Sequence, residues 1–190
     1  MIFEAKEKAE LQGLPLMVTF QDEARFGRIN NPKRCWAPHR IRPDVGKQIV
    51  REYTYLYGSF SPLDGVCDMM ILPYMTTAVM NIFLKEVSER HVDKFILMIC
   101  DGAPCHSETA LDVPSNMMIE HLPPYCPQIN PAENMWDEIS EKFFPDLVFD
   151  SMDAVEEKLV EAAMYYENNP TKVESITGFE WIVSDLLIAN

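Results

Sequence analysis

The sequence lacks the features that would place this protein in a membrane or among disordered chains. No apolar run approaches the roughly 18 residues of a membrane-spanning helix, and the N-terminus has no signal-peptide pattern. Internal repeats and low-complexity tracts are also missing. Of the 190 residues, 47% are apolar and ten are phenylalanine, which excludes general disorder. We therefore expect a soluble, cytoplasmic protein of one domain, able to bury a full core.

Cysteine is infrequent and has no regular spacing. The chain has 5 cysteines and no Cys-x-x-Cys pair, so a disulfide framework is not expected and reduced thiols fit the cytosol. One alternative is a zinc site made from Cys100, Cys105, His106, His121 and Cys126. Structural zinc sites usually contain closely spaced ligand pairs, and in a regular strand Cys100 points away from Asp101. Small buried thiols are the favoured interpretation.

Basic residues are also few. The chain has 16 Lys and Arg but 30 Asp and Glu, which gives a net charge of −14. Such a balance excludes a nucleic-acid platform over the whole surface. Half of the basic residues nevertheless lie between positions 25 and 51, where Asp44 is the one acid and where Trp36 and His39 are interleaved. A solvated loop is one interpretation of this segment; phosphate contact is the other, and we favour it. The predicted DNA-binding residues are Arg25, Arg28, Lys33, Arg34, Arg40 and Arg42.

Three acidic residues stand in settings that suit metal chemistry. Asp22 follows the apolar run at 16–21, and Asp101 follows the apolar run at 95–100. Both runs are typical of buried strands that deliver a carboxylate at their ends. Glu133 lies just inside a helix that begins after the proline-rich stretch 122–131. Carboxylate oxygens are preferred ligands of hard divalent cations, and such a set is what a two-metal phosphodiester-cutting enzyme needs.

The remaining pattern predicts an α/β fold with a mixed sheet. Strands are expected at 16–21, 52–60, 66–73, 95–100 and 117–122, with an extended excursion containing short hairpin pieces at 25–51. Helices are expected at 2–12, 76–90, 107–113, 131–144, 152–167 and 179–187. Three strands followed by β-α-β units imply helices on the faces of a mixed sheet. The first and fourth strands can then lie side by side and parallel, which would make Asp22 and Asp101 neighbours.

Three motifs carry a resemblance to a known family. They are QDEARFG at 21–27, CDGAPCH at 100–106 and LPPYCPQINPAENMW at 122–136. Together they resemble the catalytic domain of DDE transposases, of the mariner-like superfamily in its bacterial insertion-sequence branch. The resemblance runs from about residue 16 to 145, and its last block is the most specific. Two departures are Gly102, where many relatives have Asn, and a slightly short separation of Asp101 from Glu133.

The resemblance implies a ribonuclease H-like fold of five mixed strands and two Mg²⁺ or Mn²⁺ ions held by Asp22, Asp101 and Glu133. It implies one catalytic domain over residues 1–190, with residues 1–13 as a linker helix from an upstream DNA-binding region that is absent. It further implies DNA as the partner, both as terminal repeats of the element and as target, and a homodimer. His106 is added to the catalytic set, because relatives commonly have a histidine at this point.

Each of these residues also has a structural interpretation. Asp22 could cap a turn, and Asp101 with Gly102 could form an Asp-Gly turn. Glu133 stands three residues after Asn130, the position of a capping-box glutamate. Asp137 is one helical turn further on and is the reserve candidate for the ligand.

We therefore predict a DNA transposase catalytic domain that performs metal-dependent cleavage and strand transfer. The alternatives are a ribonuclease H-like nuclease without strand transfer and an inactive, transposase-derived binding module.

Overall fold

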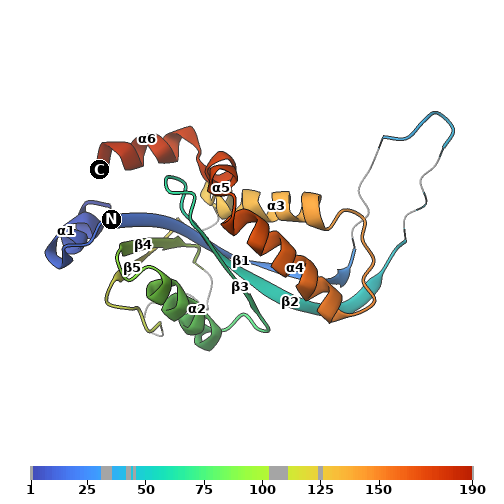
Figure 1. Ribbon diagram of the computed structural model, residues 1–190, viewed down its shortest axis with the longest axis horizontal. Coiled ribbons are helices and arrows are strands. Elements are labelled where there is room, and N and C mark those ends of the chain that lie inside the picture. Colours follow the sequence, from blue (N-terminus) through green and yellow to red (C-terminus); the bar gives the residue numbers. More distant parts are fainter. Residues whose placement is uncertain are drawn as a thin grey trace.

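Five strands form one mixed sheet in the computed structural model, in the order β3-β2-β1-β4-β5 (Figure 1). The strands are β1 Leu16–Ile29, β2 Ile49–Phe60, β3 Cys67–Leu72, β4 Phe95–Cys100 and β5 Met117–His121. β1 pairs in parallel with β4 and antiparallel with β2. The structure describes residues 2–30, 36–41, 44, 46–102, 111–123 and 126–189. The predicted mixed five-stranded α/β fold is confirmed.

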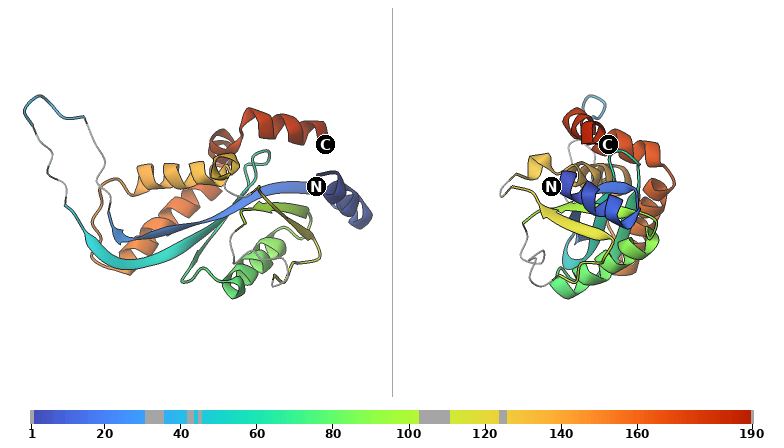
Figure 2. Two further views of the ribbon diagram at one scale, coloured as in Figure 1. Left: turned by 180° about the vertical axis from the view of Figure 1, so that it is seen from behind. Right: turned by 90° about the vertical axis from the view of Figure 1, so that its left-hand side faces the viewer.

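The helices cover both faces of this sheet. On one face lies α2 (Thr77–Arg90), whose Phe83 packs with Tyr57 and Met98. The other face carries α3 (Ala132–Phe143), α4 (Met152–Glu167), α5 (Pro170–Thr177) and α6 (Glu180–Ala189), as two opposite views show (Figures 1 and 2). α1 (Ile2–Gln12) joins this second face through buried Ala5 and Ala9, and a 3₁₀ turn, η2 (Pro127–Ile129), precedes α3. The sheet is therefore buried on both sides.

Burial explains the strand patterns. β4 is FILMIC, and all six of its residues are buried, since it lies between two parallel partners with helices above and below. Along β1, Val18 and Phe20 pack toward α1 and α6, whereas Met17 packs toward α2. This alternation places Asp22 on the same face as Phe20. None of the described helices is both long and apolar enough to cross a membrane.

The first strand differs from its prediction. We expected it to end at residue 21, but β1 continues to Ile29 and pairs with β2 as far as Ile49. The two strands continue past the end of β4 as a long ribbon, called the arm below, and α3 and α4 pack along it (Figure 1). The physical reason is an alternation that a search for apolar runs does not detect: Ala24 and Phe26 face the cluster of α3 and α4, while Arg25 faces outward. Asp22 therefore lies within a strand and not at its end.

Two further differences concern helices. α5 was not predicted, because its eight residues form a single short segment that begins with Pro170. A short helix was predicted at 107–113; residues 107–110 lie outside the described part, and residues 111–113 are not helical. The other predicted helices are confirmed to within a few residues at their ends, the usual uncertainty of a boundary.

Candidate active site

The sheet topology brings the two aspartates to one edge. The register of the parallel pair β1 and β4 runs from Leu16 opposite Phe95 to Phe20 opposite Ile99. Asp22 and Asp101 each follow the last pair by two residues, so both lie where β4 stops and a crevice can open beside β1, although Asp22 itself stays paired with Gly58 of β2. Cys100 is buried on the α2 face, opposite to Asp22. The predicted adjacency of the two strands is confirmed.

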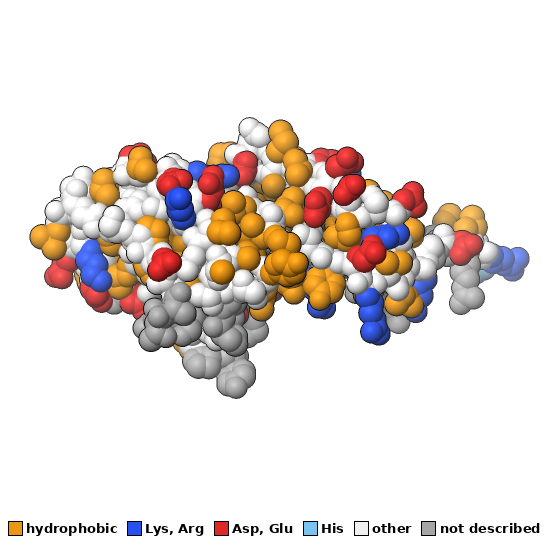
Figure 3. Space-filling model, turned by 90° about the horizontal axis from the view of Figure 1, so that it is seen from below, with side chains coloured by type: hydrophobic (Ala, Val, Ile, Leu, Met, Phe, Trp, Pro, Cys, Tyr) orange, Lys and Arg blue, Asp and Glu red, His pale blue; other side chains and the backbone are white. Residues whose placement is uncertain are grey.

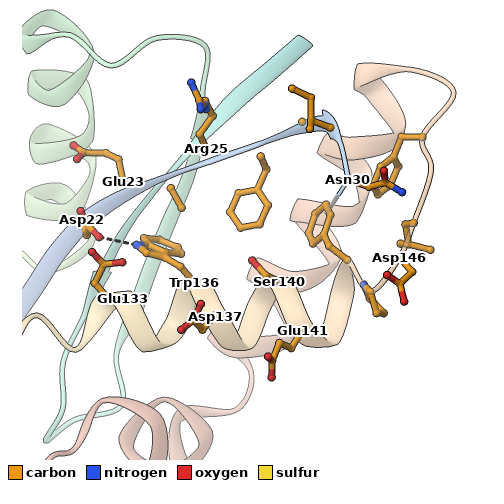
Figure 4. A pocket seen from close by; sticks show the side chains of 18 residues that line it. Asp22, Glu23, Arg25, Asn30, Glu133, Trp136, Asp137, Ser140, Glu141 and Asp146 are labelled. Carbon is orange, nitrogen blue, oxygen red and sulfur yellow. Dashed lines mark hydrogen bonds between the residues drawn. The ribbon is translucent and has the colours of Figure 1, made fainter. Parts of the chain in front are cut away.

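Glu133 reaches this edge from the first turn of α3. The helix start is capped by Asn130, whose side-chain oxygen Oδ1 accepts a hydrogen bond from the Ala132 amide at 3.1 Å. Residue 133 was equally suited to a capping box, but its carboxylate lies beside Asp22 (Figure 4). The side chains of Asp22 and Glu133 thus come from elements that are far apart in the sequence and meet in one groove.

The electrostatics show that the three carboxylates interact. Burial, with the negative charge of Glu133, raises the pKa of Asp22 to about 7, although a hydrogen bond from Trp136 opposes the shift. The pKa of Glu133 is also raised, first by burial and then by the charges of Asp137 and Asp101. The pKa shifts of Asp22 and Glu133 therefore come from burial together with nearby negative charge. A bound cation would relieve this repulsion.

Trp136 touches the first of these carboxylates. Its indole Nε1 donates a hydrogen bond to Asp22 Oδ2 at 2.8 Å (Figure 4). The ring is buried and packs edge-on against Phe60, with the ring centroids 5.3 Å apart. The ring thus belongs to the core, and its bond to Asp22 was not predicted from the sequence. The available signal was the spacing of three residues from Glu133, which places both on one helix face.

A groove of about 760 Å³ extends from this cluster between β1 and α3. Its α3 wall carries carboxylates one turn apart, at Glu133, Asp137 and Glu141, and Figure 4 shows all three along the helix. Its β1 wall includes Arg25, a cation in the groove lining. The groove is therefore acidic along α3 and at the end where Asp22 and Glu133 meet.

The predicted DNA-binding residues divide into three groups. Arg25 and Arg40 are exposed on the arm, and the Arg25 guanidinium lies 4.9 Å from the centroid of the Tyr53 ring. Arg28 is held in place, because it donates to Glu52 at 2.7 Å and to the Phe149 carbonyl at 2.9 Å. Lys33, Arg34 and Arg42 lie outside the described residues. Seen from below, Lys and Arg side chains occur on the arm and at its tip (Figure 3).

The histidine and cysteine predictions are only partly covered by the structure. His106 and Cys105 lie outside the described residues. Of the other members of the imagined zinc set, Cys100 is fully buried in the α2-facing cluster. Within the described ranges, no three His, Cys, Asp or Glu side chains are grouped closely enough to hold a metal ion as they stand. The interpretation of Cys67 and Cys100 as buried thiols is confirmed.

The raised pKa of Asp22 leads to a stability prediction. An Asp with a pKa of about 7 in the fold and about 3.9 unfolded binds more protons when folded, so stability falls as pH rises from about 4 to 7. Asp22→Asn removes this penalty. We expect the metal-free variant to gain roughly 1–2 kcal/mol at pH 8, after allowance for solvent at this half-buried group, or about 2–8 °C in melting temperature.

Thermal melts in EDTA at about pH 4 and pH 8 measure this effect, with Glu157→Gln on the exposed side of α4 as the matched control. The gain should shrink toward pH 4, where the carboxyl is protonated in both folded and unfolded chains. An Asn variant that melts below the parent protein at pH 8 would contradict the electrostatic assignment.

Comparisons with known proteins agree with this geometry. The family model described as "DDE superfamily endonuclease" matches residues 17–156. A Sinorhizobium fredii protein called "Uncharacterized protein y4pE/y4sA" is 30% identical over 131 residues, which is 68% of this chain and 96% of that protein.

Solved structures of Mos1 transposase have a similar fold. A paired-end complex with the left transposon end matches with a TM-score of 0.60 and 16% identity, over 92% of this chain and 59% of that one. A mariner paired-end complex with Mn gives the same TM-score of 0.60, also at 16% identity over 92% of this chain and 59% of that one. The chain thus spans about three-fifths of the Mos1 chains that it matches. The predicted ribonuclease H-like fold is confirmed, and the chain belongs to the DDE superfamily endonuclease family, with the fold of a transposase catalytic domain.

Proposed function

We propose that this domain cuts and rejoins DNA as the catalytic half of a transposase, using two divalent cations. One observation carries the proposal: three carboxylates from β1, the end of β4 and the start of α3 interact at one edge of the sheet, and burial and mutual repulsion raise the pKa of two of them. Grouped carboxylates that are partly buried are costly to ionise, and divalent metal would offset this cost.

The donor set fits Mg²⁺ or Mn²⁺. Asp22, Asp101 and Glu133 offer hard carboxylate oxygens, which these ions prefer, and no soft ligand is required. All three carboxylates would hold the ions. Such cations supply Lewis-acid activation of the attacking hydroxyl and neutralise charge on the phosphate. His106, five residues after Asp101, is proposed to contact the phosphate or its attacking water.

The chain's own residues would do the rest. The cations would be held by ionised carboxylates. Because the pKa of Asp22 is raised to about 7, metal affinity should increase as the pH rises through about 7 and Asp22 loses its proton. Arg25, whose guanidinium lies over the Tyr53 ring on the outward side of β1, would contact the DNA backbone beside the site. Arg40 would extend this contact, and Lys33, Arg34 and Arg42, which lie outside the described residues, are proposed to bind the DNA backbone as well.

Arg28 has a different role in this proposal. Its bonds to Glu52 and to the Phe149 carbonyl tie the base of the arm to the segment after α3. A guanidinium with both of these partners offers little to a phosphate. We assign it to the support of the arm, next to the DNA-binding residues.

Recognition of specific sequence would come from a separate DNA-binding unit, with two copies of the catalytic domain acting on two DNA ends. The net charge of −14 supports a division of this kind, because basic residues are concentrated in the arm. Backbone contacts position DNA but carry no direct sequence information.

The decisive experiment separates strand transfer from hydrolysis. Donor DNA would be cut from the flanks of the coding sequence so that it ends in a free 3′-hydroxyl, and then incubated with a supercoiled plasmid and Mn²⁺. We expect donor–plasmid joints that appear with Mn²⁺ and vanish in EDTA. Donor DNA that ends in a 3′-dideoxy nucleotide is the matched control, since it cannot attack.

Other products would favour the alternatives. Plasmid nicks of equal yield with both donors, and no joints, indicate a ribonuclease H-like nuclease. No product with either donor, together with a melting temperature that Mn²⁺ does not change, indicates a binding module and overturns the proposal.

A further inference from the structure

Two side chains at the start of α3 bond to adjacent residues of β1. The Asn130 amide Nδ2 donates to the Gln21 carbonyl at 3.3 Å, and the Trp136 indole donates to Asp22 Oδ2 at 2.8 Å. Asn130 and Trp136 each stand three residues from Glu133, on opposite sides of it. The segment that presents Glu133 is thus fastened at both ends to the strand that presents Asp22.

Both of these hydrogen bonds are made by buried side chains. Asn130 is 4% exposed and Trp136 is 7% exposed. Hydrogen bonds are stronger where water does not compete, and a buried donor that loses its partner costs about 1–3 kcal/mol. Asn130 does two jobs at once, because its Oδ1 also accepts from the Ala132 amide and caps the helix. The Asn130 side-chain amide therefore contacts both the start of α3, through Oδ1, and β1, through Nδ2.

The position of the Trp136 indole is also restricted by its packing against β2. Gly58 of β2 pairs directly with Asp22, and a Cβ built on Gly58 would lie 2.5 Å from the Trp136 ring and 2.5 Å from the Phe60 ring. Only glycine leaves room for the indole at this place. Because Phe60 also packs against Trp136 edge-on, the N–H vector toward Asp22 has little freedom.

We propose that Asn130 and Trp136 are positioning residues that fix Glu133 relative to Asp22 and orient the Asp22 carboxylate in the site. This inference rests on the proposed function. An indole N–H can donate but cannot bind a cation, so its bond to Oδ2 orients this carboxylate without acting as a metal ligand. Partners of this kind orient metal ligands without touching the metal.

Mn²⁺ alone is the probe for the first experiment, with free Mn²⁺ measured by electron paramagnetic resonance. Trp136→Phe keeps an aromatic ring but removes the N–H donor, and Asn130→Ser keeps a capping oxygen but removes the amide donor. We expect each variant to bind Mn²⁺ about tenfold or more weakly, as for other residues that orient metal ligands. Trp181→Phe, at a half-exposed tryptophan on α6, is the control and should stay within about twofold of the parent protein.

A second readout needs no activity and no metal. The chain has 3 tryptophans, so a nitrogen–proton correlation spectrum shows one indole signal for each. The Trp136 signal, identified by its loss in Trp136→Phe, should move in Asp22→Asn while that of Trp181 stays in place. Added Mn²⁺ should broaden the Trp136 signal before it broadens the Trp181 signal.

The outcomes distinguish an error in the positioning roles of Asn130 and Trp136 from an error in the proposed metal site. If the parent protein binds Mn²⁺ and Asp22→Asn abolishes binding, but both Trp136→Phe and Asn130→Ser bind normally, the positioning roles are wrong. If Asp22→Asn does not weaken binding, the proposed metal site itself is wrong. Melting curves accompany both variants; should Trp136→Phe fail to fold, Asn130→Ser decides the question.

Discussion

Asp22→Asn is expected to reduce DNA cleavage about 1000-fold or more, down to the background of the assay. The reason is that this carboxylate would be one of the cation ligands, so its loss would weaken the activation of the attacking hydroxyl and the charge compensation at the phosphate that bound cations supply. A factor of about 10³ corresponds to about 4 kcal/mol of transition-state stabilisation. The measurement is the rate of nicking of a supercoiled plasmid in Mn²⁺ at pH 8.

Matched variants of the other acids make this result specific. Asp101→Asn and Glu133→Gln should be as inactive as Asp22→Asn, since each would remove a ligand. Asp137→Asn should keep activity within about tenfold, because Asp137 acts on Glu133 through its charge and not as a ligand. The reverse pattern, with an inactive Asp137→Asn and an active Glu133→Gln, would transfer the third ligand position to Asp137.

Gly58→Ala is expected to destabilise the protein by about 1–3 kcal/mol, the range for one extra group in a well-packed core. The new methyl group would lie 2.5 Å from ring atoms of both Phe60 and Trp136, and these are not the ends of flexible chains. For a domain of this size the melting temperature should fall by about 2–12 °C. Displacement of Trp136 should also weaken Mn²⁺ binding, because it moves the indole away from Asp22.

A double-mutant cycle tests where the strain lies. Trp136→Phe removes the part of the indole that meets the new methyl group, so Gly58→Ala should cost less in that background than in the parent protein. Gly46→Ala is the matched control, since its methyl group would meet only a Val148 side chain, at 3.1 Å. It should change stability by less than about 0.5 kcal/mol. Equal costs of Gly58→Ala in both backgrounds would place the strain at Phe60 alone.

The sheet and the approach of the acids were predictable because they follow from strong local signals. The apolar runs before Asp22 and Asp101 identify parallel neighbours, and parallel strands bring their ends to one edge. The proline-rich lead into α3 predicted where Glu133 would start a helix. Neither inference required knowledge of a specific tertiary contact.

The parts that sequence alone missed depend on contacts between distant segments. The hydrogen bond from Trp136 to Asp22 joins residues 114 positions apart in the sequence. The Trp136 ring fits in its place only because Gly58 has no side chain. Arg28 could not be told from Arg25 by composition, because its partners Glu52 and Phe149 come from other elements. The arm was missed since its inward residues alternate with charged ones.

The length of β1 has a mechanical consequence. Before Asp22 the strand is clamped between β4 and β2, whereas beyond it only β2 continues alongside. Arg25 sits three residues further along this same backbone, with no turn between it and Asp22. If the arm contacts DNA as proposed, a displacement of β1 at Arg25 would be carried along an unbroken strand to Asp22. DNA binding at the arm would then change the position of this carboxylate in the site.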